Sequence, residues 1–334
     1  MPSDREWNGM LAIEMRGLTR QYGPLVAVDH LDLAAHRGEL LAFLGPNGAG
    51  KTTTIRMLGG LIRPTKGQAL IDGIDVTEHP LEVKTRIGIV PQRSNLYGEL
   101  TARENLIFIA KLYGLPRNQR QGRVDELLAQ FTLTDRANTS FAALSGGMKR
   151  RLTIAAALIH RPSILFLDEP TTGLDVQSAR QLRALIADLR QQGATIFLTT
   201  HLIQEAERLA DRVAIVVKGR LIVVDTPQAL RARFQDESAL EITVAEPTEE
   251  LLTKLSNSLA ITGVSRSGDT LRLAVTSLDD ALRDVTATTQ LLHIPLQAIR
   301  TTQPSLEDAF MRITSLDADS MRNGAPGNQR GGQE

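Results

Sequence analysis

The sequence contains no cysteine among its 334 residues, which excludes disulfide bonds and thiolate metal sites. It carries no net charge, because 38 lysines and arginines balance 38 aspartates and glutamates, so the overall basic field of a nucleic-acid-binding protein is absent. No apolar run approaches the roughly 18 residues that span a bilayer, and the first ten residues lack the apolar core of a signal peptide. These absences predict a cytoplasmic protein that relies on another chain for any step across a membrane.

Short apolar runs alternate with amphipathic segments between residues 11 and 235. Runs such as ELLAFLGP, RIGIVPQ, SILFLDEP and TIFLTTH end at polar residues, and helices are expected after several of them, for example at 176–191 and 202–210. This alternation predicts an α/β core with a largely parallel sheet. Residues 98–160 depart from the pattern, because three consecutive segments have helical periodicity, which predicts a helical insertion between core strands.

A second, smaller domain is expected at residues 236–314. Its patterns predict strands at 240–246, on both sides of SRSGDT and at 296–301, and helices at 248–258, 277–289 and 305–314. This order is typical of a small α+β domain with a split βαβ arrangement. Residues 315–334 are polar and glycine-rich, and we expect them to be disordered.

A glycine-rich loop, GPNGAGKTT, matches the pattern G-x-x-x-x-G-K-[ST], follows an expected strand and opens an expected helix. Glycines let successive amides point at the α- and β-phosphates of a nucleotide. Lys51 would reach the β- and γ-phosphates, and the Thr52 hydroxyl suits Mg²⁺. A glycine-rich turn without a ligand is the alternative interpretation. The residues predicted to hold the phosphates are Gly45, Pro46, Asn47, Gly48, Ala49, Gly50, Lys51, Thr52 and Thr53.

Two adjacent carboxylates, Asp168 and Glu169, follow the apolar run ILFL. Ligands of open α/β sheets bind beyond the carboxyl ends of the strands. Asp168 is predicted to hold Mg²⁺, directly or through water. Glu169 is predicted to orient or deprotonate an attacking water. A surface turn that only ends the strand is the alternative.

The segment LSGGMKRRL begins an expected helix in an unusual way. Ser145 suits the N-cap, and Gly146 and Gly147 leave backbone amides bare. Three cations then follow, although this end of a helix prefers acids. Bare amides and positive charge predict a second phosphate site. An ordinary packing stripe on the same helix, from Leu152 to Ile159, is the alternative.

The order of these motifs resembles the ATP-binding subunits of ABC transporters, and the resemblance covers about residues 11–235. It extends to Gln92 as the Q-loop residue, TGLD at 172–175 as the D-loop and His201 as the switch histidine. Tyr22 matches the aromatic residue that stacks on adenine. Taken singly, such residues are ordinary structural ones. Gln92, Asp168 and His201, however, all follow expected apolar strands, so they should lie at one sheet edge near the γ-phosphate, which supports the functional interpretation.

The resemblance implies the fold of an ABC ATPase cassette, a P-loop NTPase core with a helical insertion, and binding of ATP and Mg²⁺. The implied catalytic residues are Glu169, His201 and Gln92. The implied metal-binding residues are Thr52, Gln92 and Asp168. The remaining implied nucleotide contacts are Tyr22, Ser145, Gly146, Gly147 and Asp175.

The family also implies a partner for the second phosphate site. Its signature loop, here residues 144–147, binds the γ-phosphate of ATP held by the opposite subunit. The resemblance therefore implies a head-to-tail homodimer, or a pair with a related ATPase subunit, with two composite sites. A separate membrane-spanning permease would complete the transporter.

Two details are similar to exporters of the ABC-2 type, such as the daunorubicin-resistance type. Met148 stands where the signature commonly has glutamine, and PSLEDAF occupies residues 304–310. We therefore expect a Mg²⁺-dependent ATPase subunit of an exporter, held at the inner face of the membrane by an ABC-2 type permease, with no nucleic-acid partner. Two alternatives stay open: a non-transport ABC ATPase in DNA repair or translation, and a regulatory module that binds ATP.

Overall fold

The computed structural model describes residues 11–233, 238–302 and 305–323. The chain forms two compact units, residues 1–226 and 227–334. The division falls before the expected boundary at 235, because helix α8 (Pro227–Ala232) packs on helix α11 (Leu306–Asn323) of the second unit. Within the described residues, no helix combines the length and the hydropathy that spanning a membrane requires.

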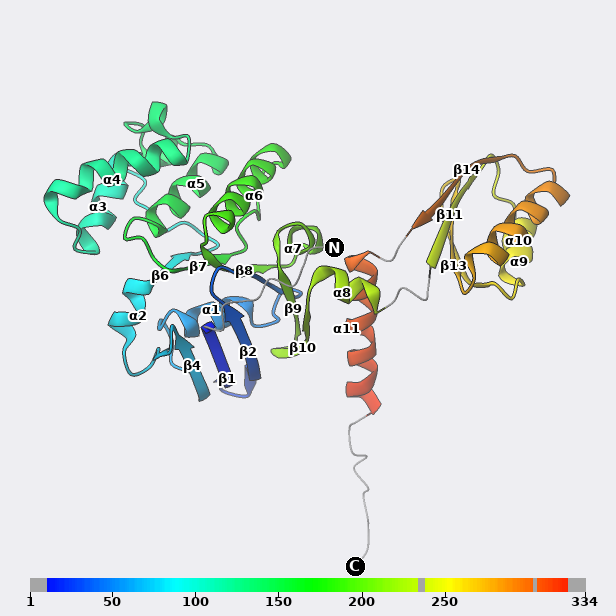
Figure 1. The fold of residues 1–334 in the computed structure, drawn as a ribbon, viewed down its shortest axis with the longest axis horizontal. Helices are drawn as coiled ribbons and strands as arrows, with labels where there is room; N and C mark the ends of the chain where they lie inside the picture. Colours follow the sequence, from blue (N-terminus) through cyan, green and yellow to red (C-terminus); the bar gives the residue numbers. More distant parts are fainter. Residues whose placement is uncertain (1–10, 234–237, 303–304, 324–334) are drawn as a thin grey trace, which may run out of the picture. The chain divides into compact units, whose positions relative to one another are not determined.

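The centre of the first unit is a six-stranded sheet in the order β10-β9-β3-β8-β7-β6. All neighbouring pairs are parallel except β9 and β10, which confirms the predicted largely parallel α/β core (Figure 1). Strands β3, β7 and β8 are buried along their whole length, since helices or a second sheet cover both faces. The strands are β3 (Leu40–Leu44), β6 (Ile87–Val90), β7 (Ile164–Asp168), β8 (Thr195–Thr200), β9 (Arg212–Val217) and β10 (Arg220–Asp225).

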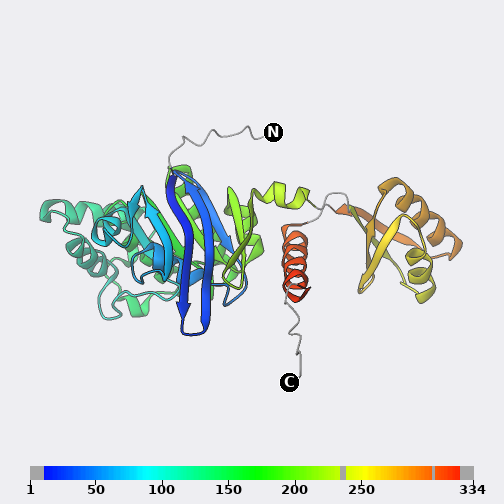
Figure 2. The same ribbon diagram turned by 90° about the horizontal axis from the view of Figure 1, so that it is seen from below.

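A smaller antiparallel sheet, which the sequence analysis did not separate, has the order β2-β1-β4-β5. Figure 2 shows β1 and β2 as a long hairpin in dark blue. With helix α1 (Lys51–Leu58), this sheet buries one face of the central sheet through an apolar cluster that includes Phe43, Phe166 and Phe197. The remaining elements here are β1 (Leu11–Tyr22), β2 (Leu25–His36), β4 (Lys66–Ile71), β5 (Ile74–Asp75) and α2 (Pro80–Arg86).

Three helices and two short 3₁₀ turns follow β6 and precede β7, which confirms the predicted helical insertion. Helix α3 begins at a capping box, in which Thr101 and Glu104 satisfy each other's backbone amides. These helices and α6 share the second apolar cluster of this unit. The insertion consists of α3 (Ala102–Leu112), α4 (Arg117–Gln130), η1 (Thr134–Arg136), η2 (Phe141–Ala143) and α5 (Gly146–Ala157). Helix α6 (Val176–Gln191) follows β7, and α7 (Ile203–Leu209) follows β8.

The second unit contains an antiparallel sheet in the order β12-β13-β11-β14. Strand β13 lies between β11 and β12, which are joined through α9, so this is the split βαβ arrangement that the sequence predicted. Thr248 and Ser277 cap its two helices. The elements are β11 (Ser238–Val244), α9 (Glu249–Ser256), β12 (Ile261–Ser267), β13 (Thr270–Val275), α10 (Leu278–Leu291) and β14 (Leu296–Thr302).

Helix α11 corrects part of the predicted disordered tail, because it continues to Asn323. The segment 315–323 contains neither glycine nor proline, and the glycines of the tail begin only at Gly324. Polar composition alone does not stop a helix, whereas glycine costs about 1 kcal/mol in its interior. Residues 324–334, the rest of that prediction, lie outside the described residues.

Candidate nucleotide-binding and catalytic site

The glycine-rich loop connects β3 to α1, as its motif requires. Gly50 has φ 93°, a left-handed conformation that favours glycine, and a Cβ there would lie 2.4 Å from the carbonyl oxygen of Ala27. A Cβ at Gly45 would lie 2.3 Å from the carbonyl oxygen of Val216. Both glycines are therefore required by close backbone approach. The loop ends at the N-terminus of α1, where free amides and the helix dipole favour a phosphate.

Lys51, the first residue of α1, carries its charge into a buried position. Its Nζ donates hydrogen bonds to the carbonyl oxygens of Gly45 at 2.8 Å and Pro46 at 3.0 Å. It also lies 3.3 Å from Glu169 Oε1. The ammonium group is thus held between the phosphate loop and the carboxylate predicted to act on water.

Oxygen ligands suited to Mg²⁺ lie beside the loop. The Thr52 hydroxyl is 2.9 Å from Asp168 Oδ2, and the Thr199 hydroxyl donates to Asp168 Oδ1 at 2.6 Å. Thr52, Gln92 and Asp168 line one cleft of about 450 Å³. No cluster of three acidic or histidine side chains within the described ranges is able to hold a metal alone. A Mg²⁺ ion here would therefore need phosphate and water oxygens as further ligands, which is its usual preference.

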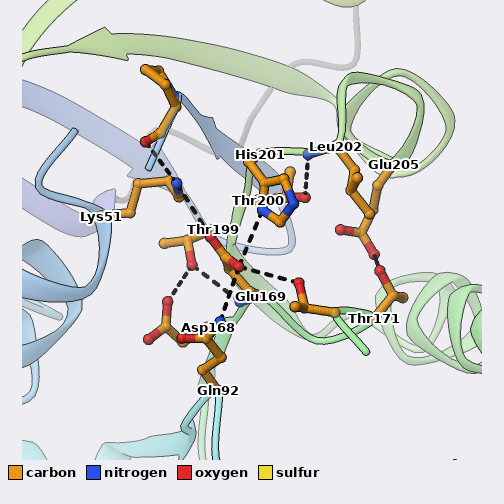
Figure 3. Close-up of polar contacts among 12 residues, drawn as sticks. Lys51, Gln92, Asp168, Glu169, Thr171, Thr199, Thr200, His201, Leu202 and Glu205 are labelled. Carbon is orange, nitrogen blue, oxygen red and sulfur yellow. Dashed lines mark hydrogen bonds and ion pairs between the residues drawn. The ribbon is translucent and has the colours of Figure 1, made fainter. Parts of the chain in front are cut away.

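Glu169 is the centre of a polar network (Figure 3). Its Oε2 accepts hydrogen bonds from Gln92 Nε2 at 3.2 Å and from the Thr172 hydroxyl at 3.1 Å, and it lies 3.1 Å from His201 Nδ1. Burial acts to raise the pKa of Glu169, but His201 and Lys51 together outweigh burial and hold that pKa below its ordinary value. The carboxylate is therefore ionised at neutral pH and able to accept a proton.

The sheet explains this convergence. Gln92 follows β6, Asp168 and Glu169 lie at the end of β7, and His201 follows β8. These three strands are parallel neighbours, so their carboxyl ends share one edge. The structure thus brings together the residues that the sequence analysis placed near the γ-phosphate.

Tyr22 lies at the end of β1, with 41% of its surface exposed and the Arg20 guanidinium 4.5 Å from its ring centre. The same hairpin reaches the phosphate loop, since Ala27 of β2 adjoins Gly50. Sequence reasoning missed its neighbours Leu25 and Val26, which are 63% and 40% exposed. An exposed apolar surface beside a phosphate loop suits a purine base.

The signature segment has a different environment from the one its charges suggested. Ser145 caps α5 by accepting a hydrogen bond from the Met148 amide at 3.3 Å. The three cations, however, are engaged within the protein. Lys149 lies over the Phe141 ring, Arg151 donates to the Phe131 carbonyl, and Arg150 is buried. Arg150 is therefore not free to reach a phosphate, and the predicted second phosphate site stays a prediction that rests on Ser145 and the amides of Gly146 and Gly147.

The signature loop and the D-loop lie together. A Cβ at Gly146 would contact Leu174, and one at Gly147 would meet Ser178 at 2.5 Å. Asp175 caps α6 by accepting from the Ser178 amide at 2.8 Å. No hydrogen bond in the described part of the chain joins residues 144–147 to the phosphate loop. The two segments predicted to bind phosphate are therefore separate within one chain.

Sequence reasoning missed several polar residues around the carboxylates. Thr199 and Thr172 bond directly to Asp168 and Glu169. Glu205 of α7 accepts from the Thr171 hydroxyl at 2.9 Å, and burial raises the pKa of Glu205. Thr199 had a signal in its position two residues before His201, which places it near the same strand end. Glu205 had none, because its contacts depend on the packing of α7.

Three features together define an ATP-binding cassette. The phosphate loop connects β3 to α1, the paired acids lie at the end of β7, which is separated from β3 by β8, and the signature helix α5 belongs to the helical insertion. The chain belongs to the family of ABC transporter ATP-binding proteins. The profile of this family, described as ABC transporter, matches residues 28–172.

Relatives and a solved structure support the assignment. The chain is 33% identical over 304 residues to the linearmycin resistance ATP-binding protein LnrL of Bacillus subtilis (strain 168), covering 90% of this chain and 98% of that protein. It is 38% identical over 311 residues to the daunorubicin/doxorubicin resistance ATP-binding protein DrrA of Streptomyces peucetius, covering 92% and 94%. The dimeric cassette MJ0796, in a post-hydrolysis state with ADP and Pi, matches with a TM-score of 0.58 and 28% identity, covering 64% of this chain and 98% of that chain.

Proposed function

We propose that this protein is the ATP-hydrolysing subunit of an exporter, that it dimerises on ATP binding and that it drives a separate membrane-spanning permease of the ABC-2 type. The observation that supports hydrolysis most directly is the ionised Glu169 carboxylate, held among Lys51, Gln92 and His201. Export is supported by the relatives, which are named as resistance proteins for linearmycin and for daunorubicin and doxorubicin. In this proposal the protein lies at the inner face of the membrane, bound through its permease.

The residues divide the reaction between them. Lys51 and the loop amides bind the phosphates and neutralise their charge. Thr52, Asp168 and Gln92 would hold Mg²⁺, which supplies charge neutralisation at the β- and γ-phosphate oxygens. Glu169 accepts the proton of the water that attacks the γ-phosphorus, and the bond from that phosphorus to the ADP oxygen breaks. Gln92 and His201 hold the carboxylate and the water in line for this attack.

The dimer proposal follows from the two anion-binding features of one chain. A head-to-tail pair with a two-fold axis would bring Ser145 and the glycine amides of each chain to the γ-phosphate bound by the other. The solved dimeric cassette is consistent with such a pair. Loss of the γ-phosphate would remove the ligand that both chains share, and the dimer would open. Hydrolysis would in this way be coupled to a change in the conformation of the dimer.

An apolar groove beside Gln92 is the surface that suits the permease. It has a volume of about 450 Å³ and lies between the central core and the helical insertion. Leu61, Ile89 and Pro91 line both this groove and the cleft of Thr52 and Asp168. Leu61 and Tyr113 are 57% and 42% exposed. A helix of the permease seated there would contact the loop that carries Gln92, so binding at the groove would reach the metal-binding cleft.

Leu61→Glu is expected to weaken binding to the permease at least tenfold, because it places a charge in an apolar groove. Because Leu61 also lines the rim of the cleft of Thr52 and Asp168, ATP affinity of the isolated subunit is measured in parallel, and it should change far less than permease binding does. Pull-down of the permease from detergent extract measures the first effect, and titration with a fluorescent ATP analogue the second. Leu259→Glu, at an exposed leucine of the second unit, is the matched control. Wild-type permease binding by Leu61→Glu would contradict the docking site.

Truncation after Thr226 is expected to leave nucleotide affinity nearly unchanged, because Tyr22, Lys51 and Asp168 all belong to the first unit. We expect it to weaken dimerisation or assembly with the permease instead. Sedimentation with and without ATP measures the effect. Cutting after Thr226 also removes α8, which packs on α11 and would be left without that partner if the cut came after Arg233. A large loss of nucleotide affinity would mean that the second unit contributes to the site.

The second candidate function, a non-transport ABC ATPase in DNA repair or translation, is distinguished by its partner. Co-purification with a polytopic membrane protein supports the exporter. Co-purification with ribosomes or DNA, and with no membrane protein, would support the alternative.

A further inference from the structure

Arg150 of the signature helix α5 is almost fully buried, with 7% of its surface exposed. Its guanidinium donates hydrogen bonds to four backbone carbonyl oxygens. Nε bonds to Pro170 at 2.8 Å and Nη2 to Asp168 at 2.8 Å. Nη1 bonds to Pro91 and, at 3.3 Å, to Gln92. All three nitrogens therefore hold backbone rather than a carboxylate.

The four carbonyls belong to the two segments that carry Glu169 and Gln92, whose side chains meet at the catalytic centre. Asp168 and Pro170 are the residues on either side of Glu169, whose φ of 45° is unusual for a residue other than glycine. Such a conformation persists only where surrounding contacts maintain it. The other two carbonyls belong to the loop of Gln92, whose side chain bonds to Glu169 at 3.2 Å. Arg150 thus holds the backbones of both members of this pair.

Only an arginine suits this position. Burial lowers the pKa of Arg150 to about 10, which still leaves the group charged at neutral pH, and the Asp168 and Glu205 carboxylates favour the charged form. A lysine would keep the charge but offers a single ammonium in place of a planar fork of donors. It therefore cannot span carbonyls from two separate loops with the same geometry.

We propose that Arg150 is a positioning residue that sets the separation of Glu169 and Gln92 around the attacking water. It does so by fixing the peptides before and after Glu169 to the loop of Gln92. The inference rests on the proposed ATP hydrolysis. In the proposed dimer it has a further consequence, because the signature helix that binds one ATP is rigidly joined to the carboxylate that acts on the other.

Arg150→Lys is expected to lower kcat about 10- to 100-fold, the loss typical of a misplaced catalytic group. KM for ATP and affinity for a non-hydrolysable ATP analogue should stay near their wild-type values, because the phosphate loop is untouched. Tm should fall, because buried carbonyls lose hydrogen bonds, but the variant should still fold. Arg151→Lys is the matched control, since Arg151 is the next residue on the same helix and bonds to Phe131. It should keep wild-type kcat.

A double variant separates positioning from general damage. If Arg150 acts through Glu169, adding Arg150→Lys to Glu169→Gln should lower kcat no further, because the group that it positions is already lost. Fully multiplicative losses would overturn the inference. So would wild-type kcat in Arg150→Lys, or a variant that fails to fold or to bind the analogue, because the residue would then be structural only. A wild-type protein without ATPase activity would instead reject the proposed function.

Discussion

Glu169→Gln is expected to stop ATP turnover while leaving ATP binding intact. The amide keeps the size of the side chain and an oxygen for Gln92, Thr172 and His201 to contact, but it cannot accept the proton of the attacking water. Loss of a general base typically costs about 10²–10⁴ in rate. The measurement is phosphate release at saturating ATP and Mg²⁺, together with analogue affinity. With ATP bound and not consumed, the variant should also accumulate as a dimer in size-exclusion chromatography.

Glu78→Gln, at an exposed glutamate in the loop before α2, is the control and should keep wild-type activity. Asp168→Asn provides the contrast, because it should lower the affinity for Mg²⁺ as well as the rate of ATP hydrolysis. Near wild-type phosphate release by Glu169→Gln would reject Glu169 as the base.

Mixing Lys51→Ala with Ser145→Arg is expected to restore ATP hydrolysis that neither variant has alone. Each homodimer has a defect in both sites. The heterodimer contains one site in which an intact Lys51 faces an intact Ser145 of the other chain. If subunits exchange freely and the two sites act independently, a 1:1 mixture should recover about a quarter of wild-type activity, because half of the dimers carry one good site of two.

The control must separate loss of a phosphate contact from loss of a helix cap. Ser145 caps α5, and removal of such a cap costs about 1 kcal/mol of stability. Thr101→Arg removes the cap of α3 in the same helical insertion, and it should stay active as a homodimer. If mixing restores no hydrolysis, cysteine crosslinking decides between coupled sites and a wrong dimer. The cysteines are introduced into this cysteine-free protein beside the phosphate loop of one chain and beside the signature loop of the other, with Lys51 and Ser145 kept. Absence of the crosslink with ATP bound would reject the composite site.

Much of the fold and of the site follows from local sequence. The loop at 45–53 is contiguous, so its glycines, Lys51 and Thr52 were recognisable as one unit before any packing was known. The apolar runs that became β3, β7 and β8 predicted buried parallel strands, because strands covered on both faces must be apolar along their whole length. Parallel strands end at a common edge, and that rule alone predicted that Gln92, Asp168 and His201 would converge.

Tertiary structure decided what depends on contacts between distant segments. In the sequence, Arg150 is one of three cations at the start of a helix. The packing of α5 against two loops buries it and makes it a hydrogen-bond donor to backbone carbonyls. Thr199 and Glu205 became parts of the network in the same way, through β8 and α7. A sequence motif identifies functional residues that lie close together in the chain. Burial and hydrogen-bond partners arise only when elements far apart in the chain pack, because each partner belongs to a different local pattern.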